Sequence, residues 1–256
     1  ISREAAKNMS GHSKWNNIKR KKEKTDGAKA KVFTKIGREL SVAVKEGGGP
    51  DPNSNSKLKD CIAKAKAANV PNDNIERIIK KAAGEGNEHQ FETINYEGYG
   101  PNGVAVIVEA LTDNRNRTAA DVRHAFDKFG GNLGTTGCVS FLFEKKGLLV
   151  IEREDRDEDH VMEDALEAGA SDFQADEDVF EIYTEPEDFS GILDDLSAKG
   201  YEFETAEIEM IPSTYVKLPD EEAEQKMQKL LDSLEDNDDV QNVWHNWESS
   251  DVSDEE

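Results

Sequence analysis

The stretch that decides the fold alternates strand-like and helix-like segments in the second half of the chain. It begins with LLVIE at Leu148–Glu152, EDHVMEDALEA at Glu158–Ala168 and VFEIYT at Val179–Thr184, and it ends with PEDFSGILDDLSA at Pro186–Ala198 and YEFETAEIEM at Tyr201–Met210. The first, third and fifth segments have strand character, whereas the second and fourth repeat apolar residues every three to four positions. This order is close to β-α-β-β-α-β and predicts a ferredoxin-like unit.

The segments just before this unit predict a second sheet. Val104–Leu111 reads as a β-branched strand, and Thr118–Phe129 reads as a helix with Val122, Phe126 and Phe129 on its inner face. Thr118 and Asp121 resemble a capping box at the start of that helix. A glycine-rich loop then leads into a further strand expected over Cys138–Glu144.

A helix and a strand also follow the ferredoxin-like unit, and they are too few to bury their own apolar faces. They are expected over Asp220–Leu234 and Val240–Trp247. We therefore expect residues 87–144 and 211–248 to form one discontinuous middle α/β domain, into which the acidic residues 145–210 are inserted. The tail, residues 249–256, is expected to be disordered because it is acidic and polar.

The first part of the chain predicts a small three-helix domain. Its first helix carries an apolar stripe, and Gly47-Gly48-Gly49-Pro50 stops it. Asn55 or Ser56 can start the second helix, and Asn72 or Asp73 can cap the third. This domain is assigned to residues 9–86, and residues 1–8 are expected to be a remnant upstream of a natural start at Met9. The predicted fold class is therefore α+β with three domains: an N-terminal three-helix domain, a discontinuous α/β middle domain and an inserted ferredoxin-like α/β domain.

The charge of the chain is strongly uneven. The whole chain has a net charge of −23, yet residues 9–90 hold 18 Lys+Arg against 10 Asp+Glu, and residues 151–256 hold 6 against 37. A basic module on an acidic protein is typical of a docking face for a polyanion, while the acidic remainder repels nucleic acid. The alternative is a basic face that is merely solvated.

The candidate contact residues lie in a basic arm, in the first helix and at one strand-to-helix turn. Trp15 in the arm could stack on a base. The turn TDNRNRT at Thr112–Thr118 could bind phosphate at a helix N-terminus. Alternatively, its asparagines cap the helix and its arginines are solvated or paired with acids; both alternatives stay open. The predicted nucleic-acid-binding residues are His12, Lys14, Trp15, Lys19, Arg20, Lys21, Lys22, Lys29, Lys31, Lys35, Arg38, Arg115 and Arg117.

Several other function classes find no support in the sequence. No apolar run approaches the ~18 residues of a membrane span, and the two cysteines are far apart, which favours a reduced cytoplasm. The five histidines lack metal-ligand spacing, and no nucleophile motif appears. Gly98–Gly103 matches GxGxxG but precedes a strand, so a tight turn is favoured over a nucleotide site. We expect a cytoplasmic non-enzyme with no cofactor, no metal, no membrane partner and no small-molecule substrate.

Long motifs along residues 9–248 resemble the YebC/PmpR family. They include GHSKW at Gly11–Trp15, NVPNDNIER at Asn69–Arg77, YEGYGP at Tyr96–Pro101, LTDNRNRT at Leu111–Thr118 and GGNLG at Gly130–Gly134. This family includes probable transcriptional regulatory proteins and the mitochondrial translational activator of cytochrome c oxidase. The resemblance implies three domains and one of two roles. One is DNA binding at promoters; the other is a ribosome-associated role in the synthesis of difficult peptides such as proline runs.

These observations favour a ribosome- or rRNA-associated translation factor that uses its basic end. A DNA-binding transcriptional regulator is the alternative, although no clear helix-turn-helix is visible. A further alternative is an acidic module that binds a basic protein. Charge alone does not separate DNA from RNA, because both present phosphates.

Overall fold

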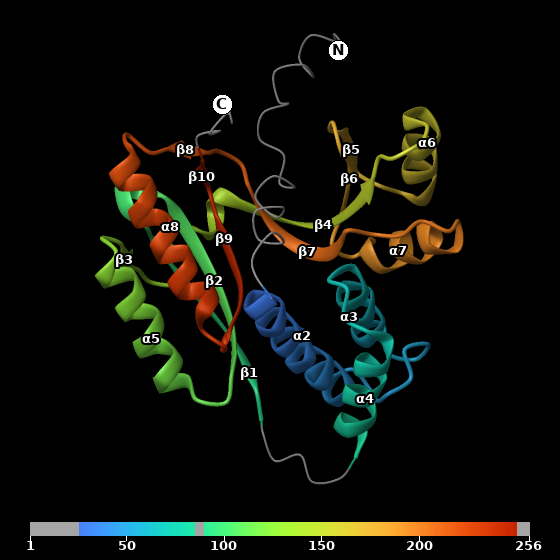
Figure 1. Ribbon diagram of the computed structural model, residues 1–256, viewed down its shortest axis with the longest axis horizontal. Coiled ribbons are helices and arrows are strands. Elements are labelled where there is room, and N and C mark those ends of the chain that lie inside the picture. Colours follow the sequence, from blue (N-terminus) through green and yellow to red (C-terminus); the bar gives the residue numbers. More distant parts are fainter. Residues whose placement is uncertain (1–25, 85–89, 250–256) are drawn as a thin grey trace. The chain divides into compact units, whose positions relative to one another are not determined.

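The computed structural model describes residues 26–84 and 90–249, which form two compact units (Figure 1). One unit joins residues up to 87 with Lys145–Glu209, and the other joins Glu88–Glu144 with the residues from Met210 onward. Helices and strands are mixed, and the predicted α+β class is confirmed. The expected remnant at residues 1–8 and the tail from residue 250 lie outside the described residues.

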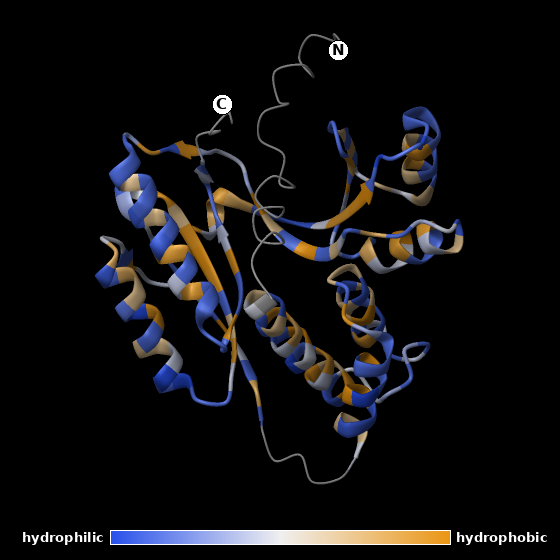
Figure 2. Cartoon of the chain, in the orientation of Figure 1, coloured by the Kyte–Doolittle hydropathy of each residue, from blue (hydrophilic) through white to orange (hydrophobic). Residues whose placement is uncertain are grey.

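Three helices form the first part of the first unit: α2 (Asp26–Glu46), α3 (Ser56–Ala67) and α4 (Asn72–Ala83). Their apolar faces meet in one core around Leu40 and Leu58, which are fully buried, and Figure 2 shows these faces turned toward one another. The predicted helix stop at Gly47–Pro50 is confirmed. The third helix begins one residue earlier than predicted, because Asn72 is already helical and Pro71 precedes it without a side-chain cap.

One asparagine organises the turn between α2 and α3. The Asn55 side-chain oxygen accepts from the Leu58 N–H, which caps α3, and its Nδ2 donates to the carbonyls of Ala43 and Gly49 at 2.8 Å each. Gly47 must lack a side chain here, since a Cβ would lie 2.1 Å from the Asn55 Oδ1. The capped loop therefore fixes where α2 ends and α3 begins.

The ferredoxin-like segment completes the first unit. Its elements are β4 (Phe143–Glu152), α6 (Glu158–Ala168), β5 (Asp172–Ala175), β6 (Val179–Thr184), α7 (Phe189–Ala198) and β7 (Thr205–Pro212). The strand order β5-β6-β4-β7 is that of a ferredoxin-like sheet, with α6 and α7 packed together. The short β5 was missed in the sequence, and Pro186 lies in the turn before α7 rather than in the helix.

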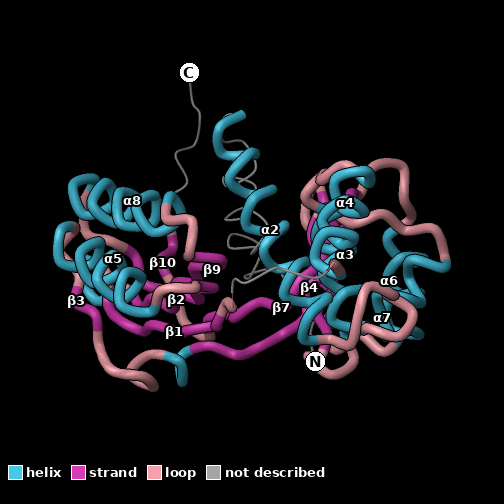
Figure 3. The backbone as a smooth tube through the Cα atoms, turned by 90° about the horizontal axis from the view of Figure 1, so that it is seen from below, coloured by secondary structure: helices cyan, strands magenta, loops and turns pink. Residues whose placement is uncertain are grey.

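The second unit contains a four-stranded sheet covered by two helices. Its elements are β1 (Glu92–Tyr99), η1 (Pro101–Gly103), β2 (Ala105–Thr112), α5 (Arg115–Lys128), β3 (Asn132–Leu133), η2 (Ser140–Leu142), β8 (Val216–Lys217), α8 (Glu221–Asp236), β9 (Val240–His245) and β10 (Trp247–Glu248). The sheet order is β3-β1-β2-β9, so strands far apart in the chain pair side by side. The helices α5 and α8 lie next to each other on one face of this sheet (Figure 3).

Three sequence expectations for this unit are corrected. Strand β1 was not predicted, although it pairs with β2 along its whole length. Residues 138–144 are mainly a turn and the short η2 rather than a strand, and β4 begins only at Phe143. The helix α5 begins at Arg115 with Asn114 as its cap, so Thr118 does not form a capping box; its hydroxyl contacts Asn114 and Asp239 instead.

Candidate nucleic-acid interface

The basic arm carries most of the predicted contacts and lies outside the described residues. This applies to His12, Lys14, Trp15, Lys19, Arg20, Lys21 and Lys22. The structure places the other predicted residues on two elements. Lys29, Lys31, Lys35 and Arg38 lie on α2, and Arg115 and Arg117 lie in the first turn of α5.

The helix α2 carries a stripe of cations on one face. Residues four and seven positions apart point to the same side of a helix, and 14 residues are close to four complete turns. Lys31, Lys35, Arg38 and Lys45 follow this spacing, and we call these four residues the basic stripe. At 1.5 Å per residue they span about 21 Å along the helix axis.

The core of the helical domain fixes the direction of this stripe. Ile36, Leu40 and Val44 are buried on the opposite face of α2, so the helix cannot rotate without exposing them. Lys45 is exposed and was not among the predicted residues. Its position seven residues after Arg38 already indicates, from the sequence, that both lie on the same face of the helix. Lys29 is exposed too, but its rotation around the helix puts it in line with Ile36 rather than with the basic stripe.

Two acids of α2 are engaged by lysines of the neighbouring helix. The Glu39 carboxylate accepts from Lys64 at 3.0 and 3.1 Å, and Glu46 lies 3.9 Å from the Lys57 ammonium. These pairs place opposite charge beside both carboxylates and reduce their repulsion of a polyanion. The basic stripe therefore gathers four cations on one face of α2, in a chain with a strongly negative net charge.

The two arginines of α5 are held by carboxylates of their own unit. Arg115 donates to both carboxylate oxygens of Glu92, at 3.2 and 2.8 Å, and this contact lowers the pKa of Glu92. Arg117 contacts both oxygens of the Asp239 carboxylate at 2.8 to 3.1 Å and also reaches Asp113 at 3.0 Å. The backbone N–H of Arg117 donates to the side-chain oxygen of Asn114, which caps the helix.

These contacts match the second of the two alternatives for the TDNRNRT turn. Asn114 caps α5 and the arginines pair with acids. Asp239 is only 4% exposed, so the pair with Arg117 ties the start of α5 to the start of β9. A phosphate at this turn would have to displace a carboxylate from each arginine.

The helices α3 and α4 offer a test for a DNA-reading motif. Residues 68–71 join them, which is the length of the turn in a helix-turn-helix. In that motif the N-terminal residues of the second helix approach the base edges. Here that position holds Asp73 and Glu76, which are exposed carboxylates. They would meet the negative phosphates of a duplex, so α4 is poorly suited to lie in a major groove.

The fold and charge define a multidomain α+β protein whose helical part carries a basic stripe. Two models of one family match the chain: "TACO1/YebC protein N-terminal domain" over residues 13–85 and "TACO1/YebC second and third domain" over residues 91–247. The chain belongs to the TACO1/YebC family.

Relatives and a solved structure agree with this membership. A protein of Acetivibrio thermocellus is 64% identical over 226 residues, which are 88% of this chain and 93% of that protein. A protein of Ruminiclostridium cellulolyticum is 59% identical over 88% of this chain and 91% of its own length. Both are named probable transcriptional regulatory protein. The crystal structure of a conserved hypothetical protein, Aq1575, from Aquifex aeolicus has a TM-score of 0.78 and 47% identity, and it covers 91% of this chain and 96% of that one.

The names of these relatives support a regulator of gene expression. In the part of the chain that the structure describes, no helix combines the length and hydropathy that a membrane span requires.

Proposed function

We propose that the protein is a nucleic-acid-binding regulator of gene expression that acts in the cytoplasm on the ribosome, through rRNA. The observation that carries this proposal is the basic stripe on α2, which lies opposite the buried face of that helix in a chain of net charge −23. The basic arm directly precedes this helix in sequence. Arm and stripe together would bind the phosphates of one RNA segment, and the acidic remainder would limit nonspecific contact.

The preference for RNA rests on the helical domain. A helix-turn-helix reader of duplex DNA needs a second helix whose first turn tolerates the major groove, and Asp73 and Glu76 oppose this in α4. Single-stranded or irregular RNA needs only a cationic track and stacking side chains. The resemblance further suggests that the ribosomal role helps the synthesis of difficult peptides such as proline runs.

The second candidate is a DNA-binding transcriptional regulator, which the names of the relatives favour. In that case the arm and the basic stripe would contact a duplex backbone. Arg115 and Arg117 contribute in either case only if a phosphate replaces Glu92 or Asp239 as their partner.

Co-sedimentation of the full chain with purified ribosomes separates the candidates. The salt concentration is varied, and promoter duplex DNA is present as a competitor. We expect pelleting near physiological salt that is lost when Lys19, Lys21, Lys22 and Lys35 are changed to Glu. Transfer of the protein to the duplex would support the transcriptional role. Binding to neither would overturn the nucleic-acid proposal and favour a protein partner.

A further inference from the structure

The acidic residues of the chain leave two long gaps in the sequence. Of 256 residues, 55 are Asp or Glu, yet residues 5–22 and residues 128–143 contain neither, and these are the two longest stretches of this kind. The first holds most of the basic arm and lies outside the described residues. The second runs from the end of α5 through β3 and η2 to the start of β4. A polyanion that approaches this second stretch meets no carboxylate belonging to it.

Two aromatic side chains are exposed at this second stretch. Phe141 is 72% exposed and Tyr99 is 38% exposed, and in the part of the chain that the structure describes they are the only aromatic residues in the exposed class. Tyr99 ends β1, and its hydroxyl donates to the Cys138 carbonyl at 3.3 Å. This contact holds the Tyr99 side chain against the segment that carries Phe141. Both aromatic side chains are therefore open to a ligand at one place in the second unit.

The backbone around the exposed phenylalanine is held on both sides. Before it, the Glu97 carboxylate is only 6% exposed and accepts from the backbone N–H groups of Val139 and Ser140 at 3.0 Å each. After it, the Leu142 carbonyl accepts from the backbone N–H and the hydroxyl of Ser213 at 2.9 Å each. The ring is thus presented by an ordered backbone, and a preordered contact costs less entropy when a ligand binds.

The surroundings of the ring fit a nucleobase better than an apolar protein surface. Phe141 is the only exposed apolar side chain within residues 128–143. A protein-docking surface buries several neighbouring apolar side chains, whereas a base needs only one aromatic face on which to stack. The exposed hydroxyls of Thr135 and Thr136 lie in the same stretch and can hydrogen-bond to RNA.

We propose that Phe141 and Tyr99 form a stacking site for unpaired bases of the RNA that the protein binds. This inference rests on the proposed function and adds a second kind of contact to it. The basic arm and the basic stripe contact phosphates, whereas the stacking site contacts bases. Bases inside a duplex are already stacked on one another, so the site selects single-stranded or looped RNA.

Stacking differs from phosphate contact in its dependence on salt. A cation that neutralises a phosphate releases a counterion and steepens the slope of log affinity against log salt. An uncharged ring adds affinity without releasing a counterion. Loss of the Phe141 ring should therefore weaken binding at every salt concentration and leave the slope unchanged, and this result separates the stacking site from the basic stripe.

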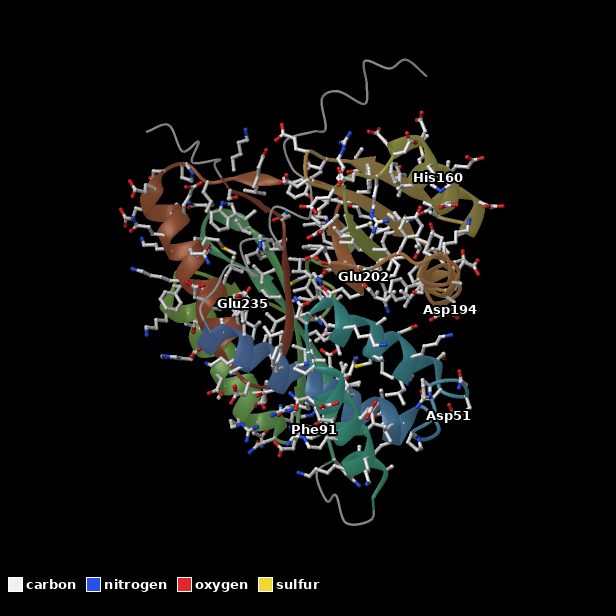
Figure 4. The ribbon with its side chains drawn as sticks, turned by 45° about the vertical axis from the view of Figure 1, so that its right-hand side comes forward. Asp51, Phe91, His160, Asp194, Glu202 and Glu235 are labelled. Atoms are coloured by element: carbon white, nitrogen blue, oxygen red, sulfur yellow. The ribbon has the colours of Figure 1, made fainter. Side chains whose placement is uncertain are left out.

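Fluorescence anisotropy of the full chain with a labelled oligouridylate, over a salt series, measures both quantities. We expect Phe141→Ala to bind roughly 5- to 150-fold more weakly, which corresponds to the loss of one base–aromatic stack, with the wild-type slope. Phe141→Trp keeps an aromatic face and should bind like the wild type. The matched control is Leu166→Ala, which removes a 53% exposed apolar side chain from α6, the helix that bears the labelled His160 in Figure 4. It should also bind like the wild type.

Photocrosslinking on the wild-type chain tests the site without relying on any variant. The probe is an oligouridylate that contains 5-iodouridine, and the crosslinked residues are identified by mass spectrometry. We expect crosslinks at Phe141 or Tyr99 that an excess of unlabelled oligouridylate removes and an equal excess of double-stranded RNA leaves in place.

The outcomes separate this inference from the proposed function. If the wild type binds the oligouridylate but Phe141→Ala binds equally well, or if neither ring is crosslinked, the stacking site is refuted while RNA binding stands. A loss in Phe141→Ala that Phe141→Trp does not restore would also refute stacking. If the wild type fails to bind the oligouridylate at all, the proposed RNA contact and the stacking site are overturned together.

Discussion

Removing the charge of the basic stripe should weaken RNA binding and flatten its dependence on salt. The change is Lys31, Lys35, Arg38 and Lys45 to Gln, which keeps long side chains with good helix propensity. These positions lie opposite the buried face of α2. The buried face of α2 is unchanged in the variant, so its helical content should equal that of the wild type.

The size of the effect follows from counterion release. Each phosphate neutralised by a protein cation contributes about 0.7 to the slope of log affinity against log salt for a single strand. If all four residues of the stripe contact phosphate, the slope should fall by about 2.8. Between 50 and 200 mM salt, the wild type would then lose roughly 50-fold more affinity than the variant. Fluorescence anisotropy with a labelled single-stranded RNA over this salt range measures the slope.

The matched control removes the same number of charges from the neighbouring helices. It changes the exposed Lys57 and Lys66 of α3 and Lys80 and Lys81 of α4 to Gln. If the stripe directs binding, the control keeps the wild-type slope. An equal loss in both variants would mean that only the net charge of the helical domain matters. A wild-type slope in the stripe variant would refute the placement on α2.

Further predictions concern stability. Leu40→Ala should lower the free energy of unfolding by about 2 to 5 kcal/mol in a denaturant titration, because Leu40 is fully buried in the helical core; a change within error would contradict that core assignment. Burial alone would raise the pKa of Glu97. Hydrogen bonds from backbone N–H groups, including those of Val139 and Ser140 at 3.0 Å, outweigh burial and hold this pKa below the ordinary 4.5. The ionised Glu97 carboxylate thus stabilises the fold above pH 4.5, and this stabilisation is lost as the pH falls through the lowered pKa. The melting temperatures of the wild type and Glu97→Gln should therefore converge in acid. A constant difference between them would contradict a stabilising role of the ionised carboxylate. Gly98→Ala would place a Cβ 2.6 Å from a β3 carbonyl oxygen and should destabilise the second unit by about 1 to 3 kcal/mol, whereas an unchanged melting curve would show that β3 can move away.

Local patterns in the sequence predicted most of the elements correctly. The apolar spacing of α2 and α8 and the strand-helix order of the ferredoxin-like segment depend on residues close together in the chain. Strand β1 was missed because ETINYEGY alternates poorly and is buried only near its end. The start of α5 was misplaced because Thr118 looks like a cap, whereas Asn114 performs that role.

Contacts between distant residues could not be predicted in the same way. Arg117 meets Asp239 across 122 positions, and no local spacing distinguishes Asp239 from the many other acids of the second half. The sequence therefore left two alternatives for the arginines of this turn. Only the pairing of β2 with β9 brings the two charges together.

The same limit applies to the lysines of the helical domain, and it changes how its net charge is interpreted. In the sequence alone, every lysine of the helical domain adds one positive charge, and no lysine can be distinguished from another as a contact for nucleic acid. In the structure, Lys59 is bonded to Asp194, and Lys64 lies between Glu39 and Glu207. These cations hold the ferredoxin-like segment and are not available to a polyanion without breaking that contact. The acidic segment thus has two effects on binding: it repels nucleic acid generally, and it occupies part of the basic charge of the helical domain.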